Sequence, residues 1–177
     1  RRATLFPYTT LFRSIISDTH FFHQNILNFK KEDGSPLREF STISDMNETI
    51  VSNWNETVRP EDNIFHLGDV CFGHKENLDI LNRLNGKKTL LLGNHEHKNI
   101  KEYIPYFYDI RAYHVLNKCI LSHIPVHDTQ LERFRCNIHG HTHWNELKDK
   151  RYKNVCVEKT NFRPIDIEEI YAFANGL

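Results

Sequence analysis

Glycine and proline are scarce in this sequence, whose 177 residues include 7 Gly and 6 Pro. It contains no internal repeat, Pro-rich linker or low-complexity segment. No apolar run approaches the roughly 20 residues that a membrane-spanning helix needs, so no membrane partner is expected. With 39% hydrophobic and 26% charged residues, the composition is that of a globular protein. The length suits one domain with a sizeable core.

An excess of charge of one sign is also absent, because 23 Lys and Arg balance 23 Asp and Glu. Such a chain has no large cationic field to hold long nucleic acid non-specifically, so this class of partner is not expected. One local basic run, KDKRYK at residues 148–153, is interpreted as a solvated turn, with an RNA contact as the alternative.

Paired cysteine motifs are missing as well. The four cysteines, Cys71, Cys119, Cys136 and Cys156, are widely spaced and form no CxxC pair. In a chain without a secretory signal, this pattern is typical of reduced, buried thiols. The sequence therefore predicts a cytoplasmic protein.

The segment 1–14 contains no acidic residue and shows neither helical nor alternating hydrophobicity. From Thr4 onward, the string TLFPYTTLFRS matches the translation of a sequencing adapter. We therefore expect residues 1–14 to be a non-native leader and residues 15–177 to form a single native domain, with a basic targeting segment as the alternative for the leader. Removing the three arginines of the leader from the 23 basic residues leaves 20 against 23 acidic residues, a net charge of −3.

Apolar runs alternate with helical patterns along the chain, which predicts an α/β fold. One helix is expected at residues 43–58, where apolar side chains recur on one face and the pattern stops before Pro60. A second is expected around Leu78, Leu81 and Leu84, and a third at residues 167–174 after an Asp166 cap. Strands are expected at residues 12–17, 63–67, 89–92, 113–116, 118–122, 135–139 and 154–158.

Five of these strands are each followed at once by residues that can bind a metal. Ligand sites in open α/β sheets lie beyond the carboxyl ends of the strands, so the five loops are expected to converge on one crevice. They carry Asp18-Thr19-His20, Gly68-Asp69, Gly93-Asn94-His95-Glu96, His123 and Gly140-His141-Thr142-His143.

Most of these clusters have an ordinary structural explanation when taken alone. Asp18 and Asn94 could be caps, and Gly68-Asp69 could be a turn. The last cluster is different, because the three histidines of His139-Gly140-His141-Thr142-His143 alternate after a strand and can present imidazoles to one side. Asp, Asn and His without a thiolate fit Mn, Fe, Zn or Ni, and the imidazoles argue against a pure Mg or Ca site. A carboxylate has two oxygens and can bridge two cations.

In this order, the motifs DxH, GD, GNH[ED], H and GHxH resemble those of the calcineurin-like metallophosphoesterases, from Ile15 to the end of the chain. The strings SDTHFFHQNILNF and HLGDVCFG are similar to a compact phage and bacterial subgroup. The resemblance implies a sandwich of two mixed β-sheets flanked by helices. It also implies a first metal on Asp18, His20 and His143, a second on Asn94, His123 and His141, and Asp69 as the bridge between them.

The activity that the resemblance implies is hydrolysis of phosphodiester or phosphomonoester bonds by a hydroxide that bridges two divalent cations, with Mn preferred and Fe, Zn or Ni as alternatives. His95 is then the catalytic residue that is not a ligand and assists the leaving group. The expected substrate is a phosphorylated small molecule or nucleotide, with Arg38 and His23 as candidate contacts to it. A catalytically silent metal-binding scaffold and a small nuclease are the alternatives.

Two further expectations concern neighbouring residues. The Gly68-Asp69 motif continues as Val70-Cys71, without the Asp-Arg-Gly of the protein serine/threonine phosphatases, and this argues against a phosphoprotein substrate. His66 and His139 are expected to support the site by packing rather than to bind metal.

Overall fold

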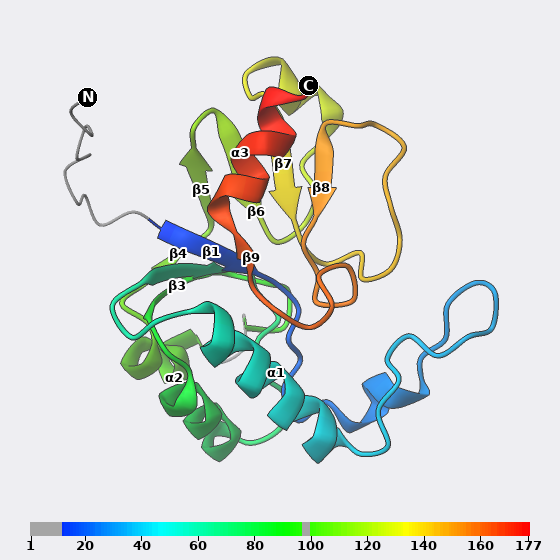
Figure 1. Cartoon of the computed structure of the whole chain (residues 1–177), viewed down its shortest axis with the longest axis vertical. Coiled ribbons are helices and arrows are strands. Elements are labelled where there is room, and N and C mark those ends of the chain that lie inside the picture. Colours follow the sequence, from blue (N-terminus) through cyan, green and yellow to red (C-terminus); the bar gives the residue numbers. More distant parts are fainter. Residues whose placement is uncertain (1–11, 97–99) are drawn as a thin grey trace, which may run out of the picture.

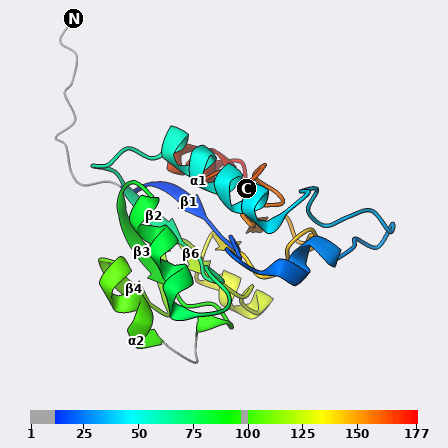
Figure 2. The ribbon, with the colours of Figure 1, turned by 90° about the horizontal axis from the view of Figure 1, so that it is seen from below.

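Two mixed β-sheets pack into a sandwich in the computed structural model, which describes residues 12–96 and 100–177. Helices flank the sandwich, and the long helix α1 (Ile43–Thr57) crosses the outer face of the larger sheet (Figures 1 and 2). The expected α/β sandwich of two mixed sheets is confirmed. Among the described residues, no helix combines the length and the hydropathy needed to cross a bilayer.

The larger sheet has five strands in the order β4-β3-β2-β1-β9. Its members are β1 (Phe12–Ile16), β2 (Asn63–His66), β3 (Lys87–Leu91), β4 (Asp109–Arg111) and β9 (Ile165–Asp166). The first four are parallel, and β9 runs antiparallel to β1. The register between β1 and β2 shifts between Phe12 and Ser14 and is regular from Ser14 onward. Thus β1 includes the end of the segment predicted to be a leader, while residues 1–11 of that segment lie outside the described part of the chain.

The smaller sheet has four strands in the order β5-β6-β7-β8. They are β5 (Tyr113–Leu116), β6 (Cys119–Ser122), β7 (Cys136–His139) and β8 (Tyr152–Asn154). β5 and β6 are antiparallel, whereas β6, β7 and β8 are parallel. The carboxyl ends of the two central strands therefore lie at the same edge.

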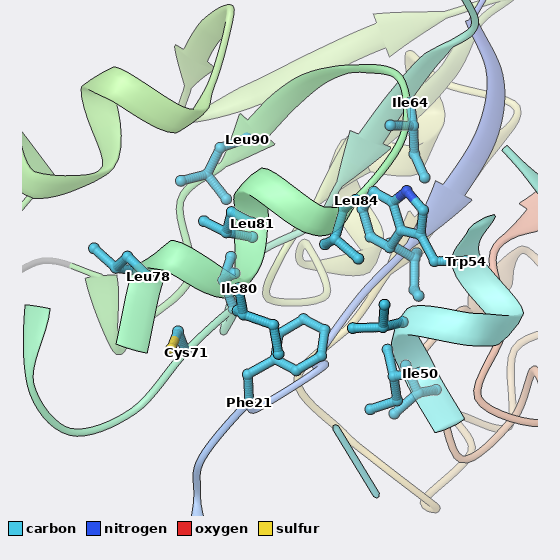
Figure 3. Close-up of a cluster of buried hydrophobic side chains, with 14 of the residues drawn as sticks. Phe21, Ile50, Trp54, Ile64, Cys71, Leu78, Ile80, Leu81, Leu84 and Leu90 are labelled. Carbon is cyan, nitrogen blue, oxygen red and sulfur yellow. The ribbon is translucent and has the colours of Figure 1, made fainter. Parts of the chain in front are cut away.

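Alternate residues of the larger sheet supply two separate cores, because successive side chains of a strand point to opposite faces. Ile16, Ile64 and Leu90 pack toward the helices, in a cluster that includes Trp54 of α1, which lies beside Ile64 and Leu84 (Figure 3). Their neighbours Ile15, Phe65 and Leu91 pack toward the smaller sheet. The sheet is thus covered on both faces, which explains the nearly continuous apolar runs of its parallel strands.

The remaining helices are short. α3 (Ile167–Asn175) closes the chain after the Asp166 cap, whose side chain accepts a hydrogen bond from the Glu168 N–H. The others are α2 (Ile100–Tyr103) and the 3-10 helices η1 (Gln24–Asn28), η2 (Lys75–Arg83), η4 (Ile104–Tyr106) and η5 (Asp128–Glu132). The expected helix around Leu78 is therefore a 3-10 helix. Its buried leucines recur every three residues, which is the period of that helix type.

The strand expected at residues 154–158 is shorter and lies earlier, as β8. Beyond Asn154 the chain leaves the smaller sheet and crosses to the larger one: the Val155 N–H donates to the His139 carbonyl, whereas the Val157 N–H donates to the Ser17 carbonyl. An isolated parallel bridge joins Cys156 to Ser17. This crossing ties the two sheets together next to Asp18.

Candidate metal centre

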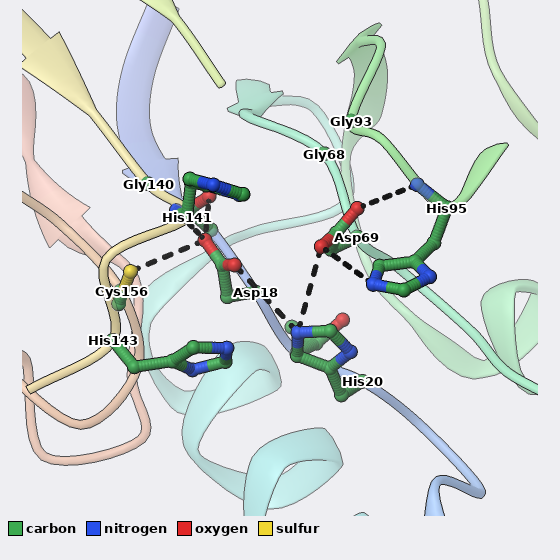
Figure 4. Close-up of polar contacts among 12 residues, drawn as sticks. Asp18, His20, Gly68, Asp69, Gly93, His95, Gly140, His141, His143 and Cys156 are labelled. Carbon is green, nitrogen blue, oxygen red and sulfur yellow. Dashed lines mark hydrogen bonds and ion pairs between the residues drawn. The ribbon is translucent and has the colours of Figure 1, made fainter. Parts of the chain in front are cut away.

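Loops from both sheets meet at one place, and each follows the carboxyl end of a central strand. The loops after β1, β2 and β3 belong to the larger sheet, and those after β6 and β7 to the smaller one. Backbone hydrogen bonds hold neighbouring loops together, from the Asp18 N–H to the Gly68 carbonyl at 3.0 Å and from the Gly140 N–H to the His123 carbonyl at 2.9 Å. The convergence expected from the sequence is confirmed (Figure 4).

The side chains at this place form two groups that could hold metal ions. Asp18, His20 and His143 make the first group, and Asp69, His123 and His141 make the second. Within each group the candidate ligand atoms all lie within 4.8 Å of one another. Asn94 joins the second group, because its Oδ1 lies 2.9 Å from His123 Nε2. These seven residues are the seven ligands that the resemblance implies, in the same division.

Asp69 lies between the two groups. Its Oδ2 is 3.7 Å from His20 Nε2 on one side and 3.4 Å from His123 Nε2 on the other. Donor atoms about 2.1 Å from a shared cation lie about 3.0 Å apart in octahedral and about 3.4 Å apart in tetrahedral geometry. The distances in the site therefore suit ligands gathered around cations, with one carboxylate placed to serve both.

Buried atoms without hydrogen bonds point to the same conclusion. Asp18 Oδ2 accepts from the Ser17 hydroxyl, the His141 N–H and the Cys156 thiol, at 2.5, 2.9 and 3.2 Å. Asp18 Oδ1, by contrast, is buried without a hydrogen-bond partner and lies 3.6 Å from His20 Nε2, which also lacks one. A buried carboxylate oxygen is costly to leave unsatisfied, so these atoms fit a site for a cation.

The backbone of the site is strained. Asp18, His20, Asp69, His141 and His143 all have positive φ angles, between 49° and 68°, and they are five of the ten non-glycine residues with positive φ in the described part of the chain. Such residues cost free energy and cluster at functional sites, where the surrounding structure holds them. Here the positive φ angles direct the candidate ligands toward the crevice shortly after the end of each strand.

Two glycines allow the loops to approach. A Cβ at Gly140 would collide with Ser17 Oγ and Asp18 Oδ2, and one at Gly93 would collide with the Asp69 carboxylate. A glycine is therefore needed at each of these positions so that the facing loop, with the candidate ligand Asp18 or Asp69, can approach.

The charges of the site stabilise one another. Burial disfavours ionised Asp18, but the neighbouring His20 and the charge of His123 hold its pKa well below the usual range. Burial also opposes the charged form of His123, yet its hydrogen bond with Asp69 and the Asp18 charge raise its pKa to about 9. His20 is different, because desolvation dominates and lowers its pKa. The pKa of Asp69 is lowered too, because His123 and His20 outweigh the effect of its burial. The two carboxylates are thus ionised and carry the negative charge that divalent cations need.

His95 is close to the ligands without belonging to either group. Its N–H donates to Asp69 Oδ1 at 3.1 Å, and its Nε2 lies 3.7 Å from Asp69 Oδ2. The side chain is 44% exposed, which sets it apart from the buried ligands His20 and His123. It borders a cavity of about 540 Å³ that is also lined by Phe72, Lys75 and Asn94.

A second cavity adjoins the opposite side of the site. Its volume is about 680 Å³, and it is lined by His141, His143, Phe29 and Lys30 among others. The two metal groups therefore lie between two spaces, each with an aromatic ring and a lysine.

The candidate substrate contact at Arg38 requires correction. A contact to substrate needs an accessible charge, but Arg38 is 2% exposed and its guanidinium bonds to Glu158 and to two backbone carbonyls. It has no surface left for a substrate. His23 is half-buried, and its ring centroid lies 4.0 Å from that of Phe72. Burial, with His20 and His95 nearby, lowers the pKa of His23 to about 4, and it remains a candidate contact.

The expected supporting role of His66 agrees with its position. His66 Nε2 is 3.0 Å from Thr19 Oγ1, whose hydroxyl donates to the Val70 carbonyl. Its Nδ1 accepts from the Gly68 N–H at 3.2 Å, so Nε2 carries the proton. His139 is fully buried, and its Nδ1 faces the Gly140 carbonyl at 2.9 Å. Neither histidine belongs to a metal group.

Two carboxylates that support the site were not identified from the sequence. Glu96 accepts hydrogen bonds from the N–H groups of Asp69, Val70 and Gly93, at 3.0, 2.6 and 2.7 Å, and so joins two ligand loops. Glu158 accepts from His143 at 2.9 Å. One available signal was the position of Glu158 directly after the apolar run Val155-Cys156-Val157, where a charge would be buried.

Comparison with known proteins finds relatives but no family model that matches the chain. The uncharacterized protein MJ1445 of Methanocaldococcus jannaschii is 32% identical over 170 residues, which cover 88% of this chain and 87% of the relative. Among solved structures, the protein of unknown function AQ665 from Aquifex aeolicus is similar with a TM-score of 0.72 and 31% identity. That match covers 90% of this chain and 97% of the other.

Proposed function

Since the chain belongs to one protein family with MJ1445 and AQ665, whose names state no activity, we propose a function from its own site. The chain is a binuclear metal-dependent phosphoesterase that resembles the calcineurin-like enzymes. The observation that carries this proposal is the position of Asp69, with one carboxylate oxygen within 3.7 Å of His20 and 3.4 Å of His123. A carboxylate between two ligand groups is the central requirement of a two-metal site.

The donor set favours particular cations. Carboxylate, carboxamide and imidazole suit Mn, with Fe, Zn and Ni as alternatives, and no thiolate contributes to either group. When bound, two such cations supply Lewis-acid chemistry, since they neutralise the charge of a phosphoryl group and activate water. The chain's own part is to hold them with seven ligands, of which Asp18, His20, Asp69 and His123 are buried, and to place the substrate between the two cavities.

His95 is the residue placed to move a proton. Its imidazole is accessible from the 540 Å³ cavity and is held beside Asp69 by its own N–H. An imidazole at this position can protonate the oxygen that leaves phosphorus or stabilise the charge that develops there. A leaving group would then depart through the cavity lined by Phe72 and Lys75.

The substrate class is a phosphorylated small molecule or a nucleotide. The cavities on both sides of the ligand groups leave room for a substituent on either side of a phosphoryl group, which accommodates diesters as well as monoesters. Lys75 lines the first cavity together with Glu96 and Glu102, and Lys30 and Lys31 line the second together with Glu32. Each cavity thus contains at least one lysine that can meet an anionic substrate.

Hydrolysis of bis-p-nitrophenyl phosphate by the metal-loaded protein tests the proposal. We expect turnover with Mn in the wild type, loss of bound metal and of turnover in Asp69→Asn, and turnover reduced about 100-fold or more in His95→Ala with the Mn content unchanged. His127→Ala is the matched control, because His127 is a histidine with a 77% exposed side chain that belongs to neither metal group. A His95→Ala variant with full activity would remove the assigned role. A wild type that binds Mn without turnover would favour the silent scaffold.

A further inference from the structure

Arg38 is a fully buried cation beside the first metal group, where a positive charge is unexpected. Its NH2 donates to the Asp18 carbonyl at 2.6 Å, and its NH1 donates to the Thr19 carbonyl at 2.9 Å. Both carbonyls belong to the loop that carries Asp18 and His20, whose φ angles are 58° and 49°. The guanidinium thus binds the strained backbone of that loop through two of its carbonyl oxygens.

Glu158 completes the arrangement on the other side. Its Oε1 accepts from Arg38 Nε at 2.8 Å and lies 2.7 Å from Arg38 NH2. The same oxygen lies 2.9 Å from His143 Nδ1. Because an ionised carboxylate only accepts hydrogen bonds, His143 must donate through Nδ1, and its Nε2 lone pair is left for a cation.

The pair therefore connects all three ligands of the first group. Arg38 contacts the backbone of the loop that carries Asp18 and His20, and Glu158 sets the tautomer of His143. A buried ion pair contributes little to stability once its desolvation is counted, and the best-supported reason to keep one is structural specificity. Five donors in a rigid plane suit Arg38 to hold a carboxylate and two carbonyls together, which a lysine cannot do.

The second group is supported differently in the described part of the chain. His123 Nδ1 lies 2.8 Å from the Leu67 carbonyl, a neutral acceptor. The loops of Asp69 and Asn94 are joined by Glu96 through backbone N–H groups. No arginine takes part in these contacts. A change at Arg38 or Glu158 should therefore act on one group and spare the other.

We propose that Arg38 and Glu158 form a positioning pair that selectively fixes the first metal group, Asp18, His20 and His143. This rests on the proposed binuclear site but adds a role that the ligands alone do not reveal. The pair does not touch substrate. It determines whether the first cation is held beside the second, so its loss converts a two-cation site into a one-cation site.

Mn binding to the purified apo protein tests this without any need for turnover. In Glu158→Gln and Arg38→Met, we expect the affinity for one Mn to fall about 10- to 100-fold, as for other residues that orient a metal-bound histidine. The second Mn should bind with wild-type affinity. Electron paramagnetic resonance should show the coupled two-Mn signal of the wild type replaced by that of isolated Mn. A residue that only stabilises the fold would not produce this selective change.

Combination with ligand variants identifies which cation is lost. Glu158→Gln with His143→Ala should still bind one Mn, because both changes affect the first group. Glu158→Gln with His123→Ala should bind none tightly, because the two changes affect different groups.

Arg83→Met is the matched control. Arg83 also contacts a carboxylate through two guanidinium nitrogens, to both oxygens of Glu48 at 2.8 and 2.6 Å, but on the surface, and two Mn should remain bound. If a single change at Arg38 or Glu158 prevents folding by leaving a buried charge alone, the double variant Arg38→Met/Glu158→Gln removes both charges together. It should fold and again bind one Mn.

Two outcomes would overturn the inference: two Mn bound with wild-type affinity in the folded variants, or equal loss of both. Failure of the proposed function gives a different result in the wild type, which would then bind fewer than two Mn, or bind two Mn without hydrolysing bis-p-nitrophenyl phosphate.

Discussion

Histidine side chains in this protein differ in their hydrogen-bond partners and in their exposure. These differences determine which histidine can bind a cation, support the site or exchange a proton. His143 faces a carboxylate with Nδ1 and is fixed as a donor there. His66 faces a hydroxyl and a backbone N–H and is enclosed by protein. His95 is accessible and anchored through its backbone. The roles proposed for the three histidines, as ligand, support and proton carrier, thus follow from their local contacts rather than from residue type.

His66 allows a prediction about pH. Burial lowers the pKa of His66 from 6.5 to about 3, so the unfolded chain binds a proton in this window that the folded chain does not. The contribution of neutral His66 to the free energy of unfolding is therefore fully present above pH 6.5. It decreases as the pH falls from 6.5 toward 3. Between pH 4 and 6, the free energy of unfolding of the metal-free protein should depend less steeply on pH in His66→Gln than in the wild type. The two slopes should differ by up to about 1.4 kcal/mol per pH unit. Denaturant unfolding measures this, and identical slopes in the two proteins would contradict it.

At the scale of elements, α1 shows how packing holds the larger sheet in place. The apolar residues of α1 lie on one face, and Trp54 on that face is fully buried, with its Nε1–H donating to the Asn85 carbonyl at 2.9 Å. The ring packs in the cluster that also contains Ile64 of β2 and Leu90 of β3, the strands that lead into the Asp69 and Asn94 loops. The helix therefore supports the bases of two ligand loops.

Trp54→Ala should lower the free energy of unfolding by about 3–5 kcal/mol, because it removes a large buried side chain from this cluster. Trp144→Ala is the matched control, since Trp144 is the second of the two tryptophans and is 43% exposed. We expect a cost of about 1 kcal/mol or less there, from lost contacts with Lys31 and Lys159. Chemical denaturation compares them, and equal costs would show that the cluster is not organised around Trp54.

The strands that carry ligands were predictable because each combines an apolar run with an abrupt polar end. β2, β3, β6 and β7 lie within two residues of their expected bounds. Short elements such as β4 and β9 were not predictable, since three and two residues are too few for a period to emerge. The role of Arg38 also could not be predicted, because its partner Glu158 is 120 residues away in the sequence. Contacts of that range depend on the crossing of the chain between sheets.

At the scale of the whole molecule, the candidate ligands come from both sheets, which also contact each other through apolar packing and through the crossing near Cys156. The first metal group draws on a loop of the larger sheet for Asp18 and on a loop of the smaller sheet for His143. The second group does the same through Asp69 and His123. Cations bound there would link the sheets, so metal binding and folding should be coupled.

Thermal unfolding tests this coupling. A cation present at about 100 times its dissociation constant stabilises the folded state by about 2.7 kcal/mol, which raises Tm by about 5–10 °C for a chain of this length. We expect that increase when Mn is added to the metal-free wild type and little or none in Asp69→Asn. Equal increases in both proteins would place the stabilising cation elsewhere.

The central claim is that two cations, bridged by Asp69, are needed together for phosphoester hydrolysis. The most direct measurement is a titration of the metal-free protein with Mn while bis-p-nitrophenyl phosphate hydrolysis is followed. The account predicts little activity at one Mn per chain, full activity at two, and none in Asp69→Asn. Full activity at one Mn per chain, or no hydrolysis with two Mn, Fe, Zn or Ni bound, would contradict it.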